Sequence, residues 1–163
     1  MTLFEQLLAD AIFSAVAATG FAVISNPPKK AVVISAMLSA IGHSFRYYLL
    51  HAQHLDIGTS TFFAAFIIGM LSLLFGKIIR CPSEVFTFPS LLPMIPGMYA
   101  YNMFLSLAKF MRSDSTLHIQ LIEDIFKNGL TAIFVMLALV VGVSLPILLF
   151  HKQSYMMSRN RRG

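Results

Sequence analysis

The chain has 163 residues, of which 57% are hydrophobic and only 12% charged, and its mean hydropathy is +0.76. Because charged residues make up about 25% of an average soluble domain, this composition excludes a soluble globular core and indicates an integral membrane protein. The formal net charge of +5 does not indicate nucleic-acid binding, because four of the twelve basic residues stand in the last twelve positions, as in a cytoplasmic flank beside anionic lipid.

The apolar residues gather into five segments, each near the roughly 20 residues that a helix needs to cross a bilayer. We therefore predict an all-α integral membrane protein with about five transmembrane helices in residues 1–150, followed by a basic cytoplasmic tail in residues 151–163. In the first segment small residues recur at four-residue spacing, which is typical of close helix packing in lipid. In chain order the segments are Leu3–Ile24, Ala31–Leu50, Thr61–Ile79, Cys81–Lys109 and Asn128–Phe150, and the last is expected to stop near Pro146.

The second segment carries Arg46, and a mid-span arginine costs about 2.5–3.5 kcal/mol on insertion scales. Such a residue usually pairs inside the protein, and its candidate partners are Asp10, Asp56 or a substrate carboxylate. A structural pair and a substrate contact are the two alternatives. His43 and Asp10 are candidate proton-coupling groups, because few other titratable groups lie in the predicted spans. A hydrogen bond to Ser39 or to a carbonyl is the alternative for His43, and an interfacial position is the alternative for Asp10.

The loop after this segment is polar and contains His51, His54 and Asp56. These side chains are candidate metal ligands, but their loop position favours solvated side chains, and no Cys/His cluster has zinc spacing. The chain has no Gly-rich phosphate loop, no GxSxG elbow and no HExxH helix. We therefore expect no enzyme, no metal and no cofactor.

The fourth segment contains four prolines, and each proline inside a helix removes a backbone hydrogen bond and clashes with the preceding turn. Broken backbone at membrane depth has to be buried in protein or line a polar cavity. We predict an irregular stretch over Phe86–Ile95, a break at Pro93 and Pro96, and a half-helix from about Pro96 to Met111, with Pro96 at its first position. A kinked structural span is the alternative.

The N-terminus of this half-helix predicts an anion site formed by the amides of Gly97, Met98 and Tyr99. Asn102 and Ser106 are four residues apart and share one face of the helix, where they either contact the substrate or bond to a neighbouring helix. Discontinuous helices mark substrate sites in many transporters. The predicted substrate-binding residues are therefore Arg46, Gly97, Met98, Tyr99, Asn102 and Ser106.

The distribution of Lys and Arg outside the spans predicts the orientation in the membrane. With five crossings and the N-terminus outside, eight basic residues fall on the inner side and three on the outer side. A re-entrant fourth segment would give seven inside and four outside, so five crossings are favoured. The inner residues are Lys29, Lys30, Lys77, Arg80, Lys152, Arg159, Arg161 and Arg162, and the outer residues are Lys109, Arg112 and Lys127.

Several stretches between Gly20 and Pro146 carry a family resemblance. They are GFAVISNPPKKAV, IGHSFRYYLL, TSTFFAAFIIG, EVFTFPSLLPMIPGMYAY and NGLTA…GVSLP, and the GH-x-x-R and P-x-x-P-G-x-x-A-Y elements are the most specific. Together they resemble the small (YjjB-like) subunit of the split threonine/serine exporter family.

This resemblance implies a bacterial inner-membrane exporter subunit that works with a larger partner encoded separately. It also implies threonine and serine as substrates, or dicarboxylates such as succinate for the split type. The resemblance supplies no settled set of binding residues. Two alternatives remain: a structural or assembly subunit of the complex without substrate contacts, and a small channel formed by a homo-oligomer.

Overall fold

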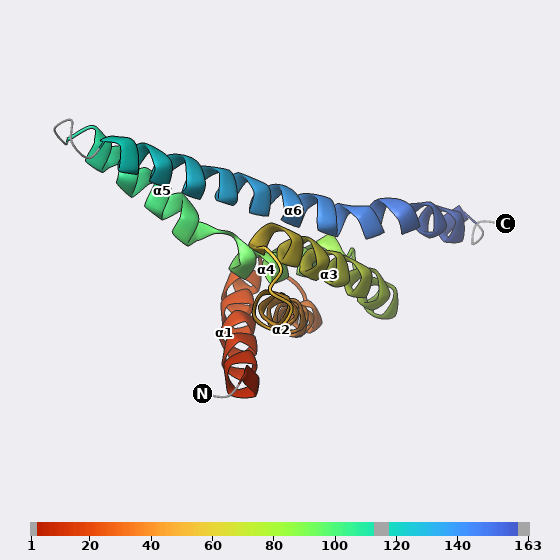
Figure 1. Cartoon of the computed structure of the whole chain (residues 1–163). Coiled ribbons are helices and arrows are strands. Elements are labelled where there is room, and N and C mark those ends of the chain that lie inside the picture. The colour runs from red at the N-terminus through yellow and green to blue at the C-terminus, as the bar shows by residue number, and fades with distance from the viewer. Residues whose placement is uncertain (1–2, 113–117, 160–163) are drawn as a thin grey trace. The chain divides into compact units, whose positions relative to one another are not determined.

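The computed structural model describes residues 3–112 and 118–159, with side chains up to residue 150, and every element in these ranges is a helix. The predicted all-α fold is therefore confirmed. The element order, which Figure 1 follows by colour, is α1 (Leu3–Ile24), α2 (Lys29–His51), α3 (Ile57–Ile79), α4 (Glu84–Leu91), the 3-10 turn η1 (Leu92–Met94), α5 (Gly97–Phe110) and α6 (His118–Arg159).

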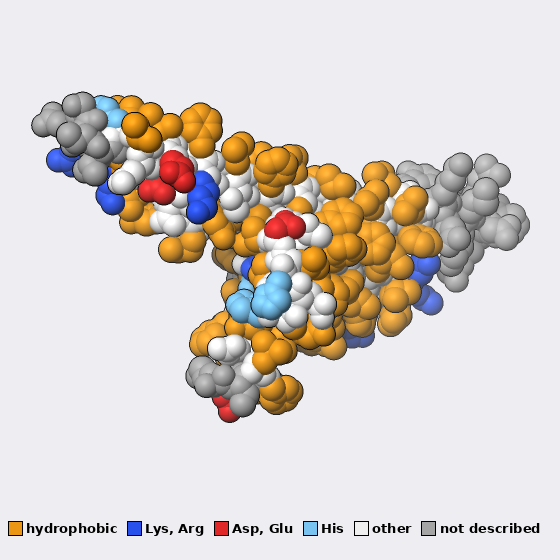
Figure 2. All heavy atoms as spheres, in the orientation of Figure 1, with side chains coloured by type: hydrophobic (Ala, Val, Ile, Leu, Met, Phe, Trp, Pro, Cys, Tyr) orange, Lys and Arg blue, Asp and Glu red, His pale blue; other side chains and the backbone are white. Residues whose placement is uncertain are grey.

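Three helices in the described ranges are long and apolar enough to cross a membrane: α1, α3 and the His118–Phe150 part of α6. Figure 2 shows that hydrophobic side chains cover most of the visible face, as expected for a surface that meets lipid. The chain is thus a membrane protein. The predicted total of about five crossings stays a prediction, since α2 and the segment that holds α4 and α5 are not among these three helices.

The first of two compact units contains residues 1–94 and 138–163, and small side chains bring its helices together. Ser39 Oγ donates to the Ser14 carbonyl at 3.1 Å and Ser14 Oγ donates back to the Ser39 carbonyl at 3.4 Å, which joins α1 to α2. Ala18 and Ala22 continue the buried face of α1. Part of the predicted stripe of small residues therefore packs α1 against α2 of the same chain.

Glycines set the spacing of the other helices in this unit. A Cβ added at Gly42 of α2 would lie 2.4 Å from Ile68 Cδ1 of α3, and one added at Gly69 of α3 would lie 2.9 Å from the Val143 carbonyl of α6. The hydrophobic core of this unit includes Leu38, Ile68, Phe86, Met94 and Leu139.

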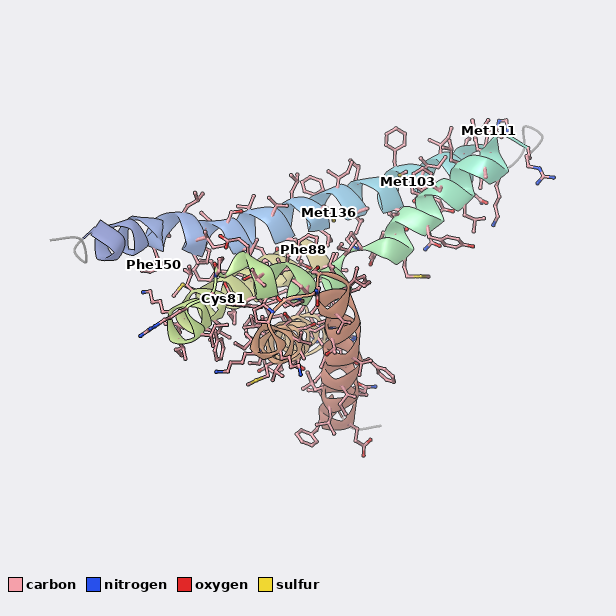
Figure 3. The ribbon with its side chains drawn as sticks, turned by 180° about the vertical axis from the view of Figure 1, so that it is seen from behind. Cys81, Phe88, Met103, Met111, Met136 and Phe150 are labelled. Atoms are coloured by element: carbon pink, nitrogen blue, oxygen red, sulfur yellow. The ribbon has the colours of Figure 1, made fainter. Side chains whose placement is uncertain are left out.

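The second unit contains residues 95–137, that is α5 and the first part of α6. These two helices run side by side (Figure 1), and a Cβ added at Gly129 of α6 would lie 2.8 Å from Met103 Sδ of α5. Figure 3 labels Met103 on α5.

Proline positions correct the sequence-based boundaries in three places. The expected irregular stretch Phe86–Ile95 is wrong for its first part, because α4 extends to Leu91 with Pro89 inside it. The expected stop near Pro146 is wrong, because α6 continues past it. Pro96 is the N-cap residue of α5, and Gly97 is the first helical residue. Helices in membranes tolerate interior prolines where neighbouring groups satisfy the freed backbone.

The first segment coincides with α1, and the predicted second and third segments and the half-helix agree with α2, α3 and α5 to within about four residues. The fifth segment was predicted too short, because α6 begins at His118 and not at Asn128. Pro93 lies inside η1, between α4 and α5. The side chains of the predicted basic tail, residues 151–163, lie outside the described residues.

Candidate functional site

Asp10, His43 and Arg46 form a continuous chain of polar contacts in the first unit. Asp10 Oδ2 of α1 lies 2.6 Å from His43 Nδ1 of α2. His43 Nε2 lies 3.1 Å from Arg46 Nη2, one turn along the same helix. Arg46 Nη1 then donates to the Met94 carbonyl at 3.1 Å, at the end of η1. The polar chain therefore joins α1, α2 and the backbone just before α5.

The donors and acceptors in the Asp10–His43–Arg46 contacts determine which nitrogen of the His43 ring carries the proton. A guanidinium has five N–H donors and no acceptor, so His43 Nε2 has to accept from Arg46 Nη2 and carries no proton. The one proton of the neutral imidazole is then on Nδ1, which donates to the Asp10 carboxylate at 2.6 Å. Ionised Asp10, neutral His43 and charged Arg46 sum to zero net charge.

The local sequence explains why these groups face one another. On α2 the residues Ser35, Ser39, His43 and Tyr47 repeat every four positions, so they lie along one face of the helix. Three of these four side chains bond to α1: Ser39 to Ser14, His43 to Asp10 and Tyr47 Oη to Gln6 Oε1 at 3.0 Å. The side chains of His43 and Asp10 are 16% and 21% exposed, so water reaches them only in part.

This arrangement changes the predicted pairings. Asp10 was one of three candidate partners of Arg46, and the structure links the two through His43. The alternative of a His43–Ser39 hydrogen bond is wrong, because Ser39 donates to the Ser14 carbonyl. The contact with the Met94 carbonyl was missed. Its signal in the sequence is the proline at position 96, since a helix broken there leaves the preceding carbonyls in need of donors.

The N-terminus of α5, in the second unit, carries the other predicted binding residues. The Gly97 amide donates to the Ile95 carbonyl at 2.8 Å, so one of the three predicted anion-binding amides is already used. A Cβ added at Gly97 would meet nothing within 4 Å, which shows that space is open beside this residue. Asn102 is exposed and Ser106 is 9% exposed.

The polar residues in and beside the α2–α3 loop cap α3 or pack on α2. Asp56 is the N-cap residue of α3, and its carboxylate accepts the Thr59 amide at 2.9 Å and the Thr59 hydroxyl. The hydrogen bond from the Thr59 side chain, followed by that from its backbone, lowers the pKa of Asp56. His51 stacks on Tyr47 with 3.9 Å between ring centroids. Among the described residues no three His, Cys, Asp or Glu side chains group as a metal site requires.

Comparison with known proteins assigns the chain to a family of membrane exporters. Residues 10–149 match the family model described as "Threonine/Serine exporter, ThrE". The chain is also 36% identical over 151 residues to an uncharacterized protein of Haemophilus influenzae (strain ATCC 51907 / DSM 11121 / KW20 / Rd). That match covers 91% of this chain and 49% of the relative, so the chain spans about half the length of that relative. No solved structure matches the chain.

Proposed function

Since the chain belongs to the threonine/serine exporter family, we propose that it is one membrane subunit of a bacterial secondary exporter for small carboxylates or amino acids. The proposed substrates are threonine and serine, or a dicarboxylate such as succinate, and all of them carry a carboxylate. The observation that carries the proposal is the Asp10–His43–Arg46 chain, because it places a guanidinium in hydrogen-bond contact with a group that can take up a proton. Arginine binds carboxylates through two parallel hydrogen bonds.

The proposed exporter also has a larger membrane subunit. Support comes from the length comparison, since this chain spans 49% of its Haemophilus relative, whose remaining sequence is long enough for further helices. Three candidate spans in the described ranges are also few for a complete transporter. We place the complex in the bacterial inner membrane with the N-terminus of this chain outside and its C-terminus in the cytoplasm, following the distribution of basic residues.

The first proposed step is an exchange of partners at Arg46. When His43 takes a second proton, on Nε2, the hydrogen bond from Arg46 Nη2 is lost, because two donors then face each other. The imidazolium keeps its contact with the Asp10 carboxylate through Nδ1. In this step Arg46 Nη2 exchanges the imidazole for a substrate carboxylate, while Nη1 keeps the Met94 carbonyl.

Charge balance gives the sign of the coupling. Before protonation the three side chains sum to zero, and after protonation they sum to +1, which one bound carboxylate returns to zero. Net charge inside a membrane protein is costly, so the proton and the carboxylate favour each other's binding. Reciprocity of binding means that the proton and the carboxylate each strengthen the other's binding. If the two also move together, as in the proposed co-transport, export runs when the outward gradient of the carboxylate exceeds the inward proton gradient.

A second proposed contact region is the N-terminus of α5. The amides of Met98 and Tyr99 would add about 0.3–1 kcal/mol to anion binding if exposed, and up to about 2 kcal/mol if partly buried. The open space beside Gly97 supports a close approach of substrate to the backbone. Asn102 and Ser106, on the same helix, would contact a substrate bound at this N-terminus.

The test is transport by proteoliposomes that contain this chain, its partner or both, with labelled threonine, serine and succinate. Transport should require both subunits. Because the proton is proposed to move with the carboxylate, uptake into the lumen should acidify it and efflux from the lumen should alkalinise it. His43→Gln should remove the pH dependence of transport. Arg46→Lys keeps the charge but loses the planar fork and should raise the KM for the carboxylate.

Tyr47→Phe is the matched control, because it removes a hydrogen bond across the same α1–α2 interface without touching a charge. It should leave both the KM and the pH dependence of transport unchanged. Full transport by the partner alone would support a structural role for this chain, and full transport by this chain alone would support a homo-oligomeric channel. Normal transport by both Arg46→Lys and His43→Gln would place the site elsewhere.

A further inference from the structure

A cavity of about 440 Å³ lies in the first unit, at the point where α3 ends and α4 begins. Its polar lining includes Lys77 and Arg80 from the end of α3 and Glu84 from the start of α4. Its apolar lining includes Leu73 from α3 and Ile147 and Phe150 from α6. Figure 3 labels Phe150 and Cys81, which also lines the cavity, at the same end of this unit. The transport mechanism proposed above uses none of these residues.

The shape of the cavity follows from the way α3 ends. Arg80 is the C-cap residue, in the left-handed conformation with φ 54° and ψ 41°, and the Cys81 amide returns to the Gly76 carbonyl at 3.2 Å. A Cβ added at Gly76 would lie 3.1 Å from the Cys81 carbonyl, so the chain folds back closely over α3. Glycine adopts the left-handed conformation most easily, and an arginine at this position costs conformational strain. In return the turn carries a guanidinium that a glycine would not supply.

The level of the cavity in the membrane follows from the helices around it. Lys77 and Arg80 follow the apolar run of α3, and the sequence after Phe150 continues as His-Lys-Gln, so the cavity lies where the apolar part of each helix gives way to polar residues. Lipid headgroups occupy this level of a bilayer, and long basic side chains near helix ends reach it. One wall of the cavity therefore suits acyl chains, and the other suits an anionic group.

We propose that this cavity binds an anionic phospholipid, with the phosphate between Lys77 and Arg80 and the acyl chains along Leu73, Ile147 and Phe150. Lys77, Arg80 and Glu84 sum to a net charge of +1, which one phosphodiester neutralises. A free phosphate would gain the same charge contacts but nothing from the apolar wall. The wall is the reason for choosing a lipid as the occupant.

The chain's single cysteine provides a built-in probe of occupancy, because Cys81 lines the cavity and is half-buried. The full chain, in detergent micelles with added phosphatidylglycerol or phosphatidylcholine, is treated with N-ethylmaleimide, and alkylation of the Cys81 peptide is followed by mass spectrometry. Phosphatidylglycerol should slow alkylation, whereas phosphatidylcholine and inorganic phosphate should not. Replacing both Lys77 and Arg80 by neutral residues should raise the phosphatidylglycerol concentration at half-maximal protection about 30-fold, because each basic residue contributes about 1 kcal/mol to binding.

Two variants separate lipid binding from folding. Arg80→Gly removes the guanidinium and relieves the left-handed backbone, so it should weaken protection by phosphatidylglycerol while thermal stability is kept or raised. Lys29→Gln with Lys30→Gln removes two basic side chains at the start of α2, away from the cavity lining, and should leave protection unchanged. Equal protection by phosphatidylcholine, or by inorganic phosphate, would overturn the proposal. So would unchanged protection in Arg80→Gly.

Discussion

The substitution Gly42→Ala tests whether the packing of α2 against α3 holds the polar chain in place. The new Cβ would lie 2.4 Å from Ile68 Cδ1, 2.6 Å from Ile68 Cγ1 and 3.0 Å from Met94 Cε. Ordinary contacts of this kind are 3.4–4 Å, so Ile68 has to recede by about 1 Å. Overpacking of this size costs about 1–3 kcal/mol. Because His43 follows Gly42 and the Met94 carbonyl accepts from Arg46, the same shift should also reduce transport.

The assay is unfolding in mixed detergent micelles, and a double-mutant cycle shows whether the clash is the cause. Ile68→Ala removes both clashing atoms and by itself costs about 2–5 kcal/mol through the cavity it leaves. Gly42→Ala with Ile68→Ala should therefore be more stable than the sum of the two single effects, by at least about 1 kcal/mol. Gly20→Ala is the control, because no atom lies within 4 Å of its Cβ position. If Gly42→Ala is as stable as Gly20→Ala, or if the cycle is additive, the inferred close packing is wrong.

Four further predictions address single features. Asp10→Asn leaves an acceptor for His43 Nδ1 but removes the negative charge beside the imidazole, so it should change the pH dependence of transport; an unchanged pH profile in both Asp10→Asn and His43→Gln would leave the coupling group to the partner. Gly97→Val should raise the KM for substrate without loss of assembly, and a normal KM would remove α5 from the site. Asp56→Ala should cost about 1 kcal/mol of folding stability at pH 7; because the folded pKa lies below 3.8, the loss should fade as pH drops through that range, and a pH-independent loss would contradict the cap. Reporter fusions should place the loop around Asp56 outside and the C-terminus in the cytoplasm, and a cytoplasmic loop would overturn the orientation.

Composition and periodicity were sufficient to predict the helical fold, because long apolar runs leave few other structures in a membrane. They failed at Pro89 and Pro146, where an isolated helix would break. Both prolines are fully buried, and α3 packs beside Pro146, whose Cγ would lie 3.0 Å from a Cβ at Gly69. Such packing depends on residues distant in the sequence, which a one-dimensional pattern does not identify.

The candidate site was predictable as a set of residues but not as a set of contacts. Asp10, His43 and Arg46 stand out because charged and titratable groups are costly in a span. Asp10 and His43 are 33 positions apart, and their contact depends on the register between α1 and α2. That register is fixed by the paired bonds between Ser14 and Ser39, which the spacing of small residues indicates only as a packing face.

A structural role of Arg46 and its proposed transport role involve the same hydrogen bonds. Its bond to the Met94 carbonyl satisfies backbone just before the break at Pro96, and a cation at the end of a helical turn is favourable there. If this were its whole task, a lysine would also serve, since an ammonium can donate to one carbonyl. Nη2, on the second arm of the fork, contacts His43 Nε2, and protonation of that nitrogen breaks the hydrogen bond. In the proposed mechanism, an arginine with one arm bonded to backbone and the other to a titratable ring links the protonation of His43 to the binding of an anion, without any need for the helix to move.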